Sequence, residues 1–349
     1  MTHWLTALRQ QYPFMQPQDV VKLLFQSIAG CGHLLDDEEA VTARIASEIA
    51  QLRPDADEPL YELLGARYAR VNLRRAMAEG ISPRWIARLM LLTGGLAQPQ
   101  LRKHIFDTIC DMPEALTGFA PAIMREAARP LLDTSWLPGH SVTYHYHYEP
   151  AYRVVSRQLV ETVLPVLCAL VRLPDKPCTM IAIDGMCASG KSTLADALGY
   201  ILDAPIARMD DFFTPHPQKT PERLAQPGGN ADVERFCEEF LTPYLTHGHA
   251  AYRPYDCHAD EFGEPVEVPA ARYVIVEGTY CLHPQTGRPY DLQVFVPVGT
   301  DVQYRRILER DGHDMLQRFA AMWIPLERAY FDAFSLPDER CLVLNHRQL

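Results

Sequence analysis

The stretch from Thr179 to Leu202 restricts the fold of this chain more than any other. An apolar segment, Thr179–Ile183, leads into a glycine-containing loop, and a helical pattern over Lys191–Leu202 follows. The loop reads GMCASGKS from Gly185 to Ser192 and matches in full the pattern GxxxxGK followed by Ser or Thr. A glycine-rich turn that matches by chance is the alternative. The position between a strand and a helix favours a phosphate-binding loop.

The residue types in this loop suit a polyphosphate. Glycines let the backbone wrap with its N–H groups pointing inward, and the N-terminus of the following helix also favours an anion. We expect Lys191 to neutralise the β- and γ-phosphates and the Ser192 hydroxyl to join the shell of a Mg²⁺ ion. The sequence therefore predicts that ATP and Mg²⁺ are the cofactors. The expected ATP-binding residues are Gly185, Ala188, Ser189, Gly190, Lys191, Ser192 and Thr193.

Residues 178–349 alternate apolar strands with helices. The predicted strands are Thr179–Ile183, Pro205–Met209, Tyr273–Val276, Leu292–Val296 and Cys341–Leu344. Strands that are apolar throughout and alternate with helices indicate a parallel sheet covered on both faces. We therefore expect a doubly wound α/β domain of the P-loop NTPase type over residues 178–349.

Residues 1–150 carry helical patterns instead. Ser82 and Pro83, for example, read as an N-cap and a first helical residue, and no convincing strand precedes residue 140. The alternation of tyrosine and histidine over 144–148 predicts an extended segment. We expect an all-α N-terminal domain over residues 1–150 and a linking helix over residues 151–177. The N-terminal domain either shapes the acceptor site, forms a homo-oligomer or regulates the second domain.

Acidic residues end two more of the predicted strands. Asp210 and Asp211 follow the second strand, and Glu277 follows the third. These positions lie at the carboxyl edge of the sheet, where ligands bind in such folds. A carboxylate there can accept the proton of a hydroxyl during in-line phosphoryl transfer, and we assign this role to Asp210. Asp211 and Glu277 are expected to bind Mg²⁺ with Ser192, partly through water. The alternative is that both aspartates cap the loop.

A basic helical segment follows the fourth predicted strand. Arg306 and Arg310 are four residues apart and therefore share one face of a helix. Guanidinium groups on a mobile helix can close over phosphates and stabilise the charge that develops during transfer. We assign both arginines to a catalytic lid, with a solvated arginine face as the alternative.

These segments together resemble the uridine kinase and phosphoribulokinase family of small P-loop kinases. The resemblance covers about half of the chain and rests on GMCASGKST, MDDFF at 209–213, RPYD at 253–256, VIVEGTY at 274–280 and YRRILERD at 304–311. It implies transfer of the γ-phosphate of ATP to a hydroxyl of a nucleoside or sugar, with Asp210 as the catalytic aspartate. It also implies an acceptor site at Phe213, Asp232, Arg253, Tyr255 and His258.

The remaining sequence excludes several other classes. The chain has neither the NKxD motif with which GTPases read guanine nor the LSGGQ signature of ABC proteins. Acidic residues outnumber basic ones by 44 to 33, and the net charge of −11 opposes binding to nucleic acid or anionic lipid. We therefore expect a small hydroxylated substrate as the partner. A nucleotide-binding regulatory module that phosphorylates no metabolite is the alternative function.

Two features bear on location. The first fourteen residues lack the apolar core of a signal peptide, and no run of apolar residues is long enough to span a membrane. The nine cysteines form no CxxC pair, as in a protein with reduced thiols. We expect a cytoplasmic protein.

Two side-chain clusters in the first half have open roles. His140, His145 and His147 are either metal ligands or part of a polar, aromatic-rich domain junction. Arg67, Arg70 and Arg74 are predicted to share one helical face. They form either an exposed surface or a site for an anionic effector or substrate.

Overall fold

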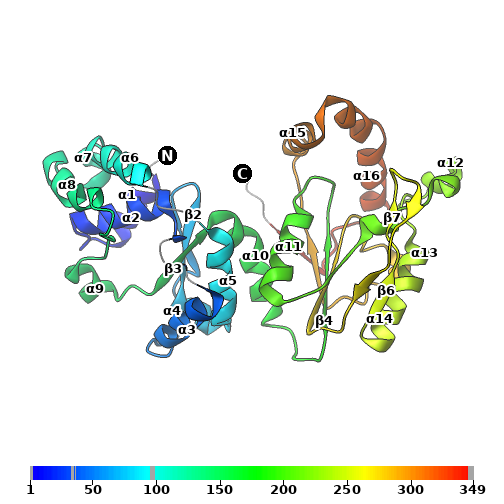
Figure 1. The fold of residues 1–349 in the computed structure, drawn as a ribbon, viewed down its shortest axis with the longest axis horizontal. Coiled ribbons are helices and arrows are strands. Elements are labelled where there is room, and N and C mark those ends of the chain that lie inside the picture. Colours follow the sequence, from blue (N-terminus) through cyan, green and yellow to red (C-terminus); the bar gives the residue numbers. More distant parts are fainter. Residues whose placement is uncertain (1–2, 33–34, 36, 95–98, 345–349) are drawn as a thin grey trace. The chain divides into compact units, whose positions relative to one another are not determined.

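The computed structural model describes residues 3–32, 35, 37–94 and 99–344. The chain divides into two compact units, Met1–Leu164 and Pro165–Leu349 (Figure 1). The division falls within helix α10 (Arg157–Leu170). Among the described helices, none combines the length and apolar character needed to cross a membrane.

The second unit is built on a five-stranded sheet, all of whose neighbouring strands are parallel. Its order is β12 (Cys341–Val343), β11 (Leu292–Phe295), β4 (Thr179–Asp184), β10 (Tyr273–Glu277) and β5 (Ile206–Arg208). The five strands predicted from the sequence and their parallel arrangement are confirmed. Because β10 lies between β4 and β5, Glu277 pairs in register with Ile183 on one side and Arg208 on the other.

Helices cover both faces of this sheet (Figure 1). Helix α11 (Lys191–Leu202) packs against β4, β10 and β5. A continuous helical stretch covers the other face: α13 (Val233–Arg235), a π-helix (Phe236–Leu241) and α14 (Thr242–His247). Aromatic residues of this stretch share a buried cluster with the small residues Ala182 and Ala207 of the sheet. The doubly wound arrangement therefore follows from strands that are apolar on both faces.

The second unit contains further elements besides this sheet and the helices that cover it. They are 3₁₀ helices at Met209–Phe212, His216–Gln218 and Pro284–Thr286; α12 (Pro221–Leu224); the paired strands β6 (Ala250–Tyr252) with β9 (Val266–Val268) and β7 (Tyr255–Asp256) with β8 (Glu261–Phe262); α15 (Thr300–Arg318); a π-helix (Phe319–Trp323); and α16 (Ile324–Ala333). Helix α15 is interrupted at Gly312, whose φ of 82° is not helical. The break follows directly after the predicted arginine face.

The first unit is mostly helical, as expected. Its helices are α1 (His3–Gln11), α2 (Pro17–Ala29), α3 (Glu38–Ile49), α4 (Leu73–Glu79), α5 (Pro83–Thr93), α6 (Pro99–Cys110), α7 (Glu114–Thr117), α8 (Pro121–Ala128), a 3₁₀ helix (Arg129–Leu132), α9 (Val142–Tyr148) and the start of α10. Helices α2, α6 and α8 pack on one another, and α3 packs on α5.

The first unit also contains a small antiparallel sheet that the sequence did not predict. It comprises β1 (Tyr61–Leu64), β2 (Tyr68–Asn72) and β3 (Tyr152–Ser156) in that order. The prediction of no strand before residue 140 was therefore wrong. The helix expected from residue 151 begins only at Arg157, because residues 152–156 pair with β2.

Two further expectations in this unit were wrong. Residues 144–148 are not extended but lie in helix α9, because the side chain of Ser141 caps the helix by accepting a hydrogen bond from the Tyr144 N–H. The arginine cluster does not share a helical face either. Arg67 lies in the turn before β2, Arg70 lies within β2, and Arg74 lies in α4.

Candidate active site

The phosphate loop joins β4 to α11 through backbone conformations that favour glycine. The φ angles are 148° at Gly185 and 101° at Gly190, and Ala188 between them also has a positive φ of 56°. A Cβ atom at Gly185 would lie 2.3 Å from the carbonyl oxygen of Val296. A side chain at Gly185 therefore requires the backbone of one segment to move.

Asp184, the last residue of β4, anchors the start of this loop. Its fully buried carboxylate accepts hydrogen bonds from the Gly185 N–H at 2.6 Å, the Tyr330 hydroxyl at 2.8 Å and the Leu282 N–H at 3.1 Å. Burial raises the pKa of Asp184, and these hydrogen bonds act against the rise. The sequence interpretation gave Asp184 no role. An acidic residue at the end of an otherwise apolar strand was the available signal.

Lys191 and Ser192 begin helix α11. The ammonium group of Lys191 is largely buried and donates a hydrogen bond to the Met186 carbonyl oxygen at 2.9 Å, across the loop. The Ser192 hydroxyl donates to Oε1 of Glu277 at 3.1 Å. Two residues that lie far apart in the sequence and were both predicted to bind Mg²⁺ are thus brought together.

Glu277 is held among charges at the end of β10. Its Oε2 accepts a hydrogen bond from Nη1 of Arg208 at 3.1 Å, and the same guanidinium pairs with Asp196 at 2.6 Å. Burial raises the pKa of Glu277, the nearby charge of Lys191 lowers it, and that of Asp210 raises it. The carboxylate therefore lies within the electrostatic reach of both the phosphate loop and Asp210.

The two neighbouring aspartates after β5 have different surroundings. Asp210 is exposed, whereas Asp211 is half-buried, and its Oδ2 accepts a hydrogen bond from the Tyr252 hydroxyl at 2.8 Å. Burial raises the pKa of Asp211, and the charge of Asp210 contributes to the rise. Asp210 therefore presents its carboxylate to solvent, while one oxygen of Asp211 is already engaged.

Helix α15 lies against the phosphate loop. Nη1 of Arg306 donates hydrogen bonds to the carbonyl oxygens of Ala188 at 3.0 Å and Ser189 at 3.1 Å, and the Gln303 amide donates to the Cys187 carbonyl at 3.0 Å. The sequence interpretation did not include Gln303. Arg306 thus reaches the loop through two of its carbonyls.

Arg310 lies one turn further along α15. It pairs with Asp311 at 2.8 Å. The hydrogen bond to Asp311 raises the pKa of Arg310, and the charge of Asp210 adds to the rise. Arg310 and Asp210 therefore interact electrostatically, although they are far apart in the sequence.

Glu327 on α16 is a second acidic residue at the loop that the sequence interpretation missed. Its buried Oε2 accepts a hydrogen bond from the Cys187 N–H at 2.9 Å. Burial raises the pKa of Glu327, and the charge of Lys191 lowers it. Nothing in the sequence pattern singles out Glu327, because it lies 140 residues from the loop within an ordinary helical stretch.

Phe213 and Asp232 lie beside the aspartate pair. Phe213 forms a backbone bridge with Ala231, and Nζ of Lys219 lies 5.8 Å from the centre of its ring. Asp232 caps α13 by accepting a hydrogen bond from the Arg235 N–H at 3.1 Å. Asp232 therefore has a structural partner in addition to its predicted role at the acceptor.

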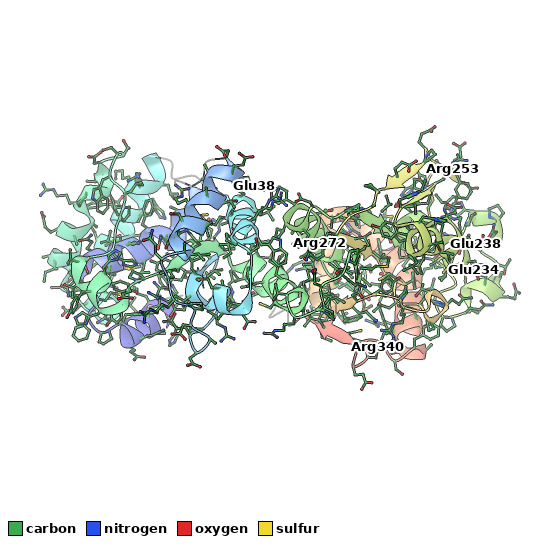
Figure 2. The ribbon with its side chains drawn as sticks, turned by 90° about the horizontal axis from the view of Figure 1, so that it is seen from below. Glu38, Glu234, Glu238, Arg253, Arg272 and Arg340 are labelled. Carbon is green, nitrogen blue, oxygen red and sulfur yellow. The ribbon has the colours of Figure 1, made fainter. Side chains whose placement is uncertain are left out.

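The segment after β6 holds the other three predicted acceptor residues. Arg253 lies on the outside of the second unit (Figure 2), where its guanidinium donates to the carbonyl oxygens of Phe262 and Gly263. The Tyr255 hydroxyl is bonded to Asp260, and the N–H of exposed His258 donates to Asp256 at 2.7 Å. The structure thus gathers these residues on one short hairpin.

This hairpin lies close to Asp210. Burial raises the pKa of Cys257, which sits between Tyr255 and His258, and the charge of Asp210 contributes to the rise. Arg235 ties the two segments together by donating to the carbonyl oxygens of Asp211 at 2.6 Å and Arg253 at 2.8 Å. An acceptor molecule bound at the hairpin would therefore lie beside Asp210.

Metal ligands were predicted at Ser192, Asp211 and Glu277. Ser192 and Glu277 are in contact, whereas Asp211 is bonded to Tyr252. Within the described residues, no group of three or more His, Cys, Asp or Glu side chains is arranged to hold a metal ion. His140, His145 and His147 of the first unit are among the residues to which this applies.

Comparisons with known proteins give partial matches. No protein-family model and no curated protein matches the chain. A protein of Bacillus stearothermophilus described as a possible uridine kinase is similar over 54% of this chain and 98% of its own, with 15% identity and a TM-score of 0.42. A protein of Silicibacter described as a candidate fructose transport system kinase is similar over 48% and 94%, with 25% identity and a TM-score of 0.41. The D-glycerate 3-kinase of Cryptococcus neoformans is similar over 54% and 93%, with 16% identity and a TM-score of 0.39.

Proposed function

We propose that the chain is an ATP-dependent kinase that transfers the γ-phosphate to a hydroxyl of a small metabolite, a nucleoside or a sugar. The observation that carries the proposal is the placement of an exposed carboxylate, Asp210, at the same sheet edge as the phosphate loop. A protein that only binds a nucleotide has no need for a proton acceptor there.

The loop N–H groups, the N-terminus of α11 and the Lys191 ammonium would bind the phosphates of ATP. Lys191 now donates to the Met186 carbonyl oxygen, so it exchanges this neutral partner for a charged phosphate oxygen. Arg306 contacts two loop carbonyls and would add a cation beside the group being transferred. Asp210 would accept the hydroxyl proton as the acceptor oxygen attacks the γ-phosphorus in line with the leaving oxygen.

Mg²⁺ fits the donor set at this edge. The Ser192 hydroxyl and the Glu277 carboxylate both offer oxygen ligands, and they lie 3.1 Å apart. Oxygen ligands suit Mg²⁺, a hard cation that usually keeps several of its waters. When bound with ATP, the ion would supply positive charge to the phosphate oxygens. Asp211 would contribute through water, because one of its carboxylate oxygens is bonded to Tyr252.

An ADP-release assay with ATP and Mg²⁺ over a panel of nucleosides, sugars and hydroxy acids tests the proposal. We expect one class to be turned over. Asp210→Asn should lower turnover of that substrate by about 100-fold to 10,000-fold, the range for general-base catalysis, while calorimetry shows ATP binding that is largely unchanged. Asp332→Asn, which alters an exposed carboxylate on α16, is the matched control and should keep full turnover.

Two results would contradict the proposal. Turnover by Asp210→Asn at the wild-type rate would remove the aspartate from the mechanism. ATP binding without any phosphorylated product, from the panel or from a cell-extract metabolite pool with labelled ATP, would favour the nucleotide-binding regulatory module instead.

A further inference from the structure

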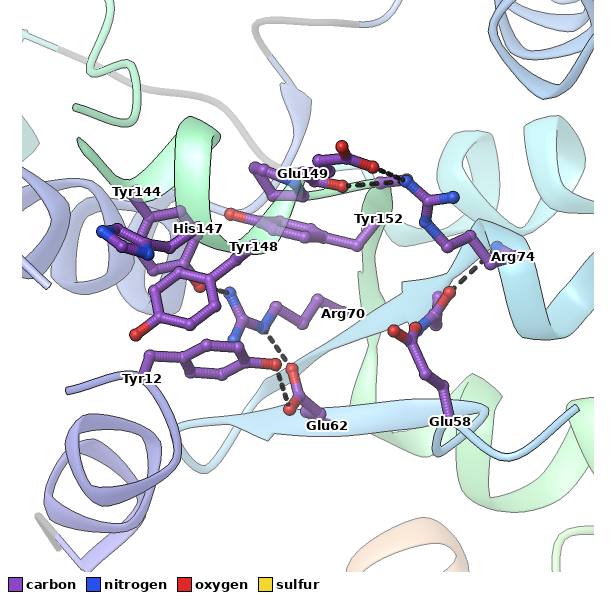
Figure 3. A pocket seen from close by; sticks show the side chains of 13 residues that line it. Tyr12, Glu58, Glu62, Arg70, Arg74, Tyr144, His147, Tyr148, Glu149 and Tyr152 are labelled. Atoms are coloured by element: carbon purple, nitrogen blue, oxygen red, sulfur yellow. Dashed lines mark hydrogen bonds and ion pairs between the residues drawn. The ribbon is translucent and has the colours of Figure 1, made fainter. Parts of the chain in front are cut away.

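The first unit contains a pocket of about 220 Å³ that the proposed kinase chemistry does not use (Figure 3). Strands β1, β2 and β3, helix α9 and the residue after α1 contribute its walls. Aromatic rings of Tyr12, Tyr148 and Tyr152 line it, and the side chains of Arg70 and Arg74 reach it from β2 and α4. The pocket lies wholly within Met1–Leu164.

Arg70 is the central residue of this pocket. Its side chain is 1% exposed and lies with its guanidinium carbon 4.6 Å from the ring centre of Tyr152 and 5.1 Å from that of Tyr12. Nε donates to Oε2 of Glu62 at 2.7 Å, and Nη1 donates to the Tyr144 hydroxyl at 3.4 Å. The remaining nitrogen, Nη2, is buried and has no hydrogen-bond partner among the described residues.

A buried guanidinium nitrogen without a partner is unusual, because desolvation of a charged donor is costly unless a hydrogen bond replaces the lost water. Glu62 does not supply this bond. One of its oxygens accepts from Arg70 Nε, and the other accepts from the Tyr12 hydroxyl and the Gln11 amide, both at 2.7 Å. Among the described residues, no acceptor atom therefore lies at hydrogen-bond distance from Nη2.

The surrounding side chains hold Arg70 in place. Nδ1 of buried His140 is 2.9 Å from the Asp19 carboxylate, and its Nε2 is bonded to the Tyr152 hydroxyl. This chain fixes the ring that stacks on the guanidinium. A donor that is held rigidly loses little entropy when a ligand binds, which favours a role in binding.

A second cation, Lys22, lies close to Arg70. Burial lowers the pKa of Lys22 to about 8, and the positive charge of Arg70 contributes to the decrease. Nζ of Lys22 lies 5.6 Å from the centre of the Tyr152 ring, and Arg70 faces the same ring. The cations of Lys22 and Arg70 therefore both lie beside the ring of Tyr152. A bound anion would reduce the repulsion between them.

The lining limits the charge and shape of this anion. It includes two guanidinium groups, Arg70 and Arg74, and three carboxylates, Glu58, Glu62 and Glu149. The three carboxylates of the lining would repel a doubly charged phosphate. A ligand with one carboxylate carries less charge, and it can accept one hydrogen bond from the free guanidinium nitrogen. The tyrosine faces suit a planar ring.

We propose that this pocket binds a small monocarboxylate with a planar ring, whose carboxylate bonds to Nη2 of Arg70 while the ring packs among Tyr12, Tyr148 and Tyr152. Nη2 is sealed from solvent in the described conformation, so half-buried Tyr12 or Tyr148 must shift to admit the ligand. The site is independent of the proposed kinase function, since every residue that builds it lies in the first unit.

Calorimetry on the full chain tests this inference with three acids and their neutral amides: benzoate, 4-hydroxybenzoate and nicotinate against benzamide, 4-hydroxybenzamide and nicotinamide. We expect at least one acid to bind about tenfold or more tightly than its amide, because the charged hydrogen bond distinguishes them. Inorganic phosphate should compete weakly or not at all. Binding of no acid, equal binding of acid and amide, or tighter binding of phosphate would overturn the proposal.

A variant pair then locates the site. Arg70→Lys keeps the charge but removes the guanidinium fork, and we expect it to weaken acid binding about tenfold or more. Arg67→Lys alters an exposed arginine in the neighbouring turn and should leave binding unchanged. Acid binding that persists in Arg70→Lys would place the site elsewhere. If Arg70→Lys does not fold by circular dichroism, the acid-amide comparison on the wild-type chain decides alone.

Discussion

Glu327 accepts a hydrogen bond from the backbone N–H of Cys187 at 2.9 Å, so a carboxylate on α16 holds the middle of the phosphate loop. The same loop is held from α15 by Gln303 and Arg306 through the carbonyl oxygens of residues 187–189. Side chains of α15 and α16 therefore bond to both kinds of backbone group in the loop, its N–H and its carbonyl groups.

We expect Glu327→Ala to lower the free energy of unfolding by about 1–3 kcal/mol, because the Cys187 N–H would lose its buried acceptor. Glu327→Gln keeps an acceptor oxygen in the same place and should lose less. Urea unfolding of the three proteins measures the difference. An equal loss in both variants would mean that the negative charge, rather than the acceptor oxygen, stabilises the loop.

Gly185→Ala should destabilise the second unit by about 2 kcal/mol or more, since it combines a φ of 148° with an approach of 2.3 Å to the Val296 carbonyl oxygen. Gly248→Ala is the matched control. Its φ of 76° is also positive, but no atom lies within 4 Å of the added Cβ, and a cost of about 1 kcal/mol is expected. Thermal unfolding that ranks Gly248→Ala as the more harmful change would show that the contact with Val296 is relieved easily.

Arg306→Ala should lower the turnover of the substrate identified in the ADP-release assay by about 100-fold, the usual effect of losing one donor to the transition state. Arg305→Ala removes the same charge from the exposed neighbouring position and should retain most of the activity. Steady-state kinetics on both variants checks this. Similar losses in the two variants would indicate a general effect of positive charge on α15.

The first unit should lose stability as the pH falls from about 6.5 towards 4. Burial lowers the pKa of His140 to about 4, so the unfolded chain binds more protons than the folded chain in this range. The loss attributable to His140 should reach about 3 kcal/mol. His140→Gln should remove it, whereas His145→Gln, an exposed histidine of α9, should not.

Tryptophan fluorescence can follow this transition selectively. Trp323 is the one tryptophan of the second unit in the sequence, and the other three, Trp4, Trp85 and Trp136, belong to the first. In a Trp323→Phe background the signal therefore reports the first unit alone. A pH dependence that is the same with and without His140 would assign the acid sensitivity to other groups.

The sequence predicted the second unit well because its signals are local and strong. Each strand is a short apolar run, and the phosphate loop is a contiguous motif, so all five strands appeared where expected. The supports of the loop were not predictable in this way. Gln303 and Glu327 act through contacts between distant segments, which no spacing in the chain records. Asp184 did carry a signal, as an acidic residue at the end of an apolar strand, but its bonds to Leu282 and Tyr330 also join distant segments.

The first unit was harder to predict because its local patterns mislead. Alternating tyrosines and histidines over 144–148 imitate a strand, yet in helix α9 the residues Tyr144 and Tyr148 lie four apart on one face with ring centres 4.8 Å apart. Strand β2 was missed because it carries Arg70 at its centre, and a buried arginine is rare. Arg70, which made this strand hard to predict, is also the residue on which the proposed pocket depends.

The position of β10 sets a working distance for the proposed chemistry. Since neighbouring strands lie about 4.8 Å apart, the strand between β4 and β5 keeps the ends of those two strands about 10 Å from each other. In the proposed reaction, the phosphate loop after β4 and Asp210 after β5 would act across this separation. Strand β10 thus sets the distance between the ends of β4 and β5, and Glu277 at its own end lies between them.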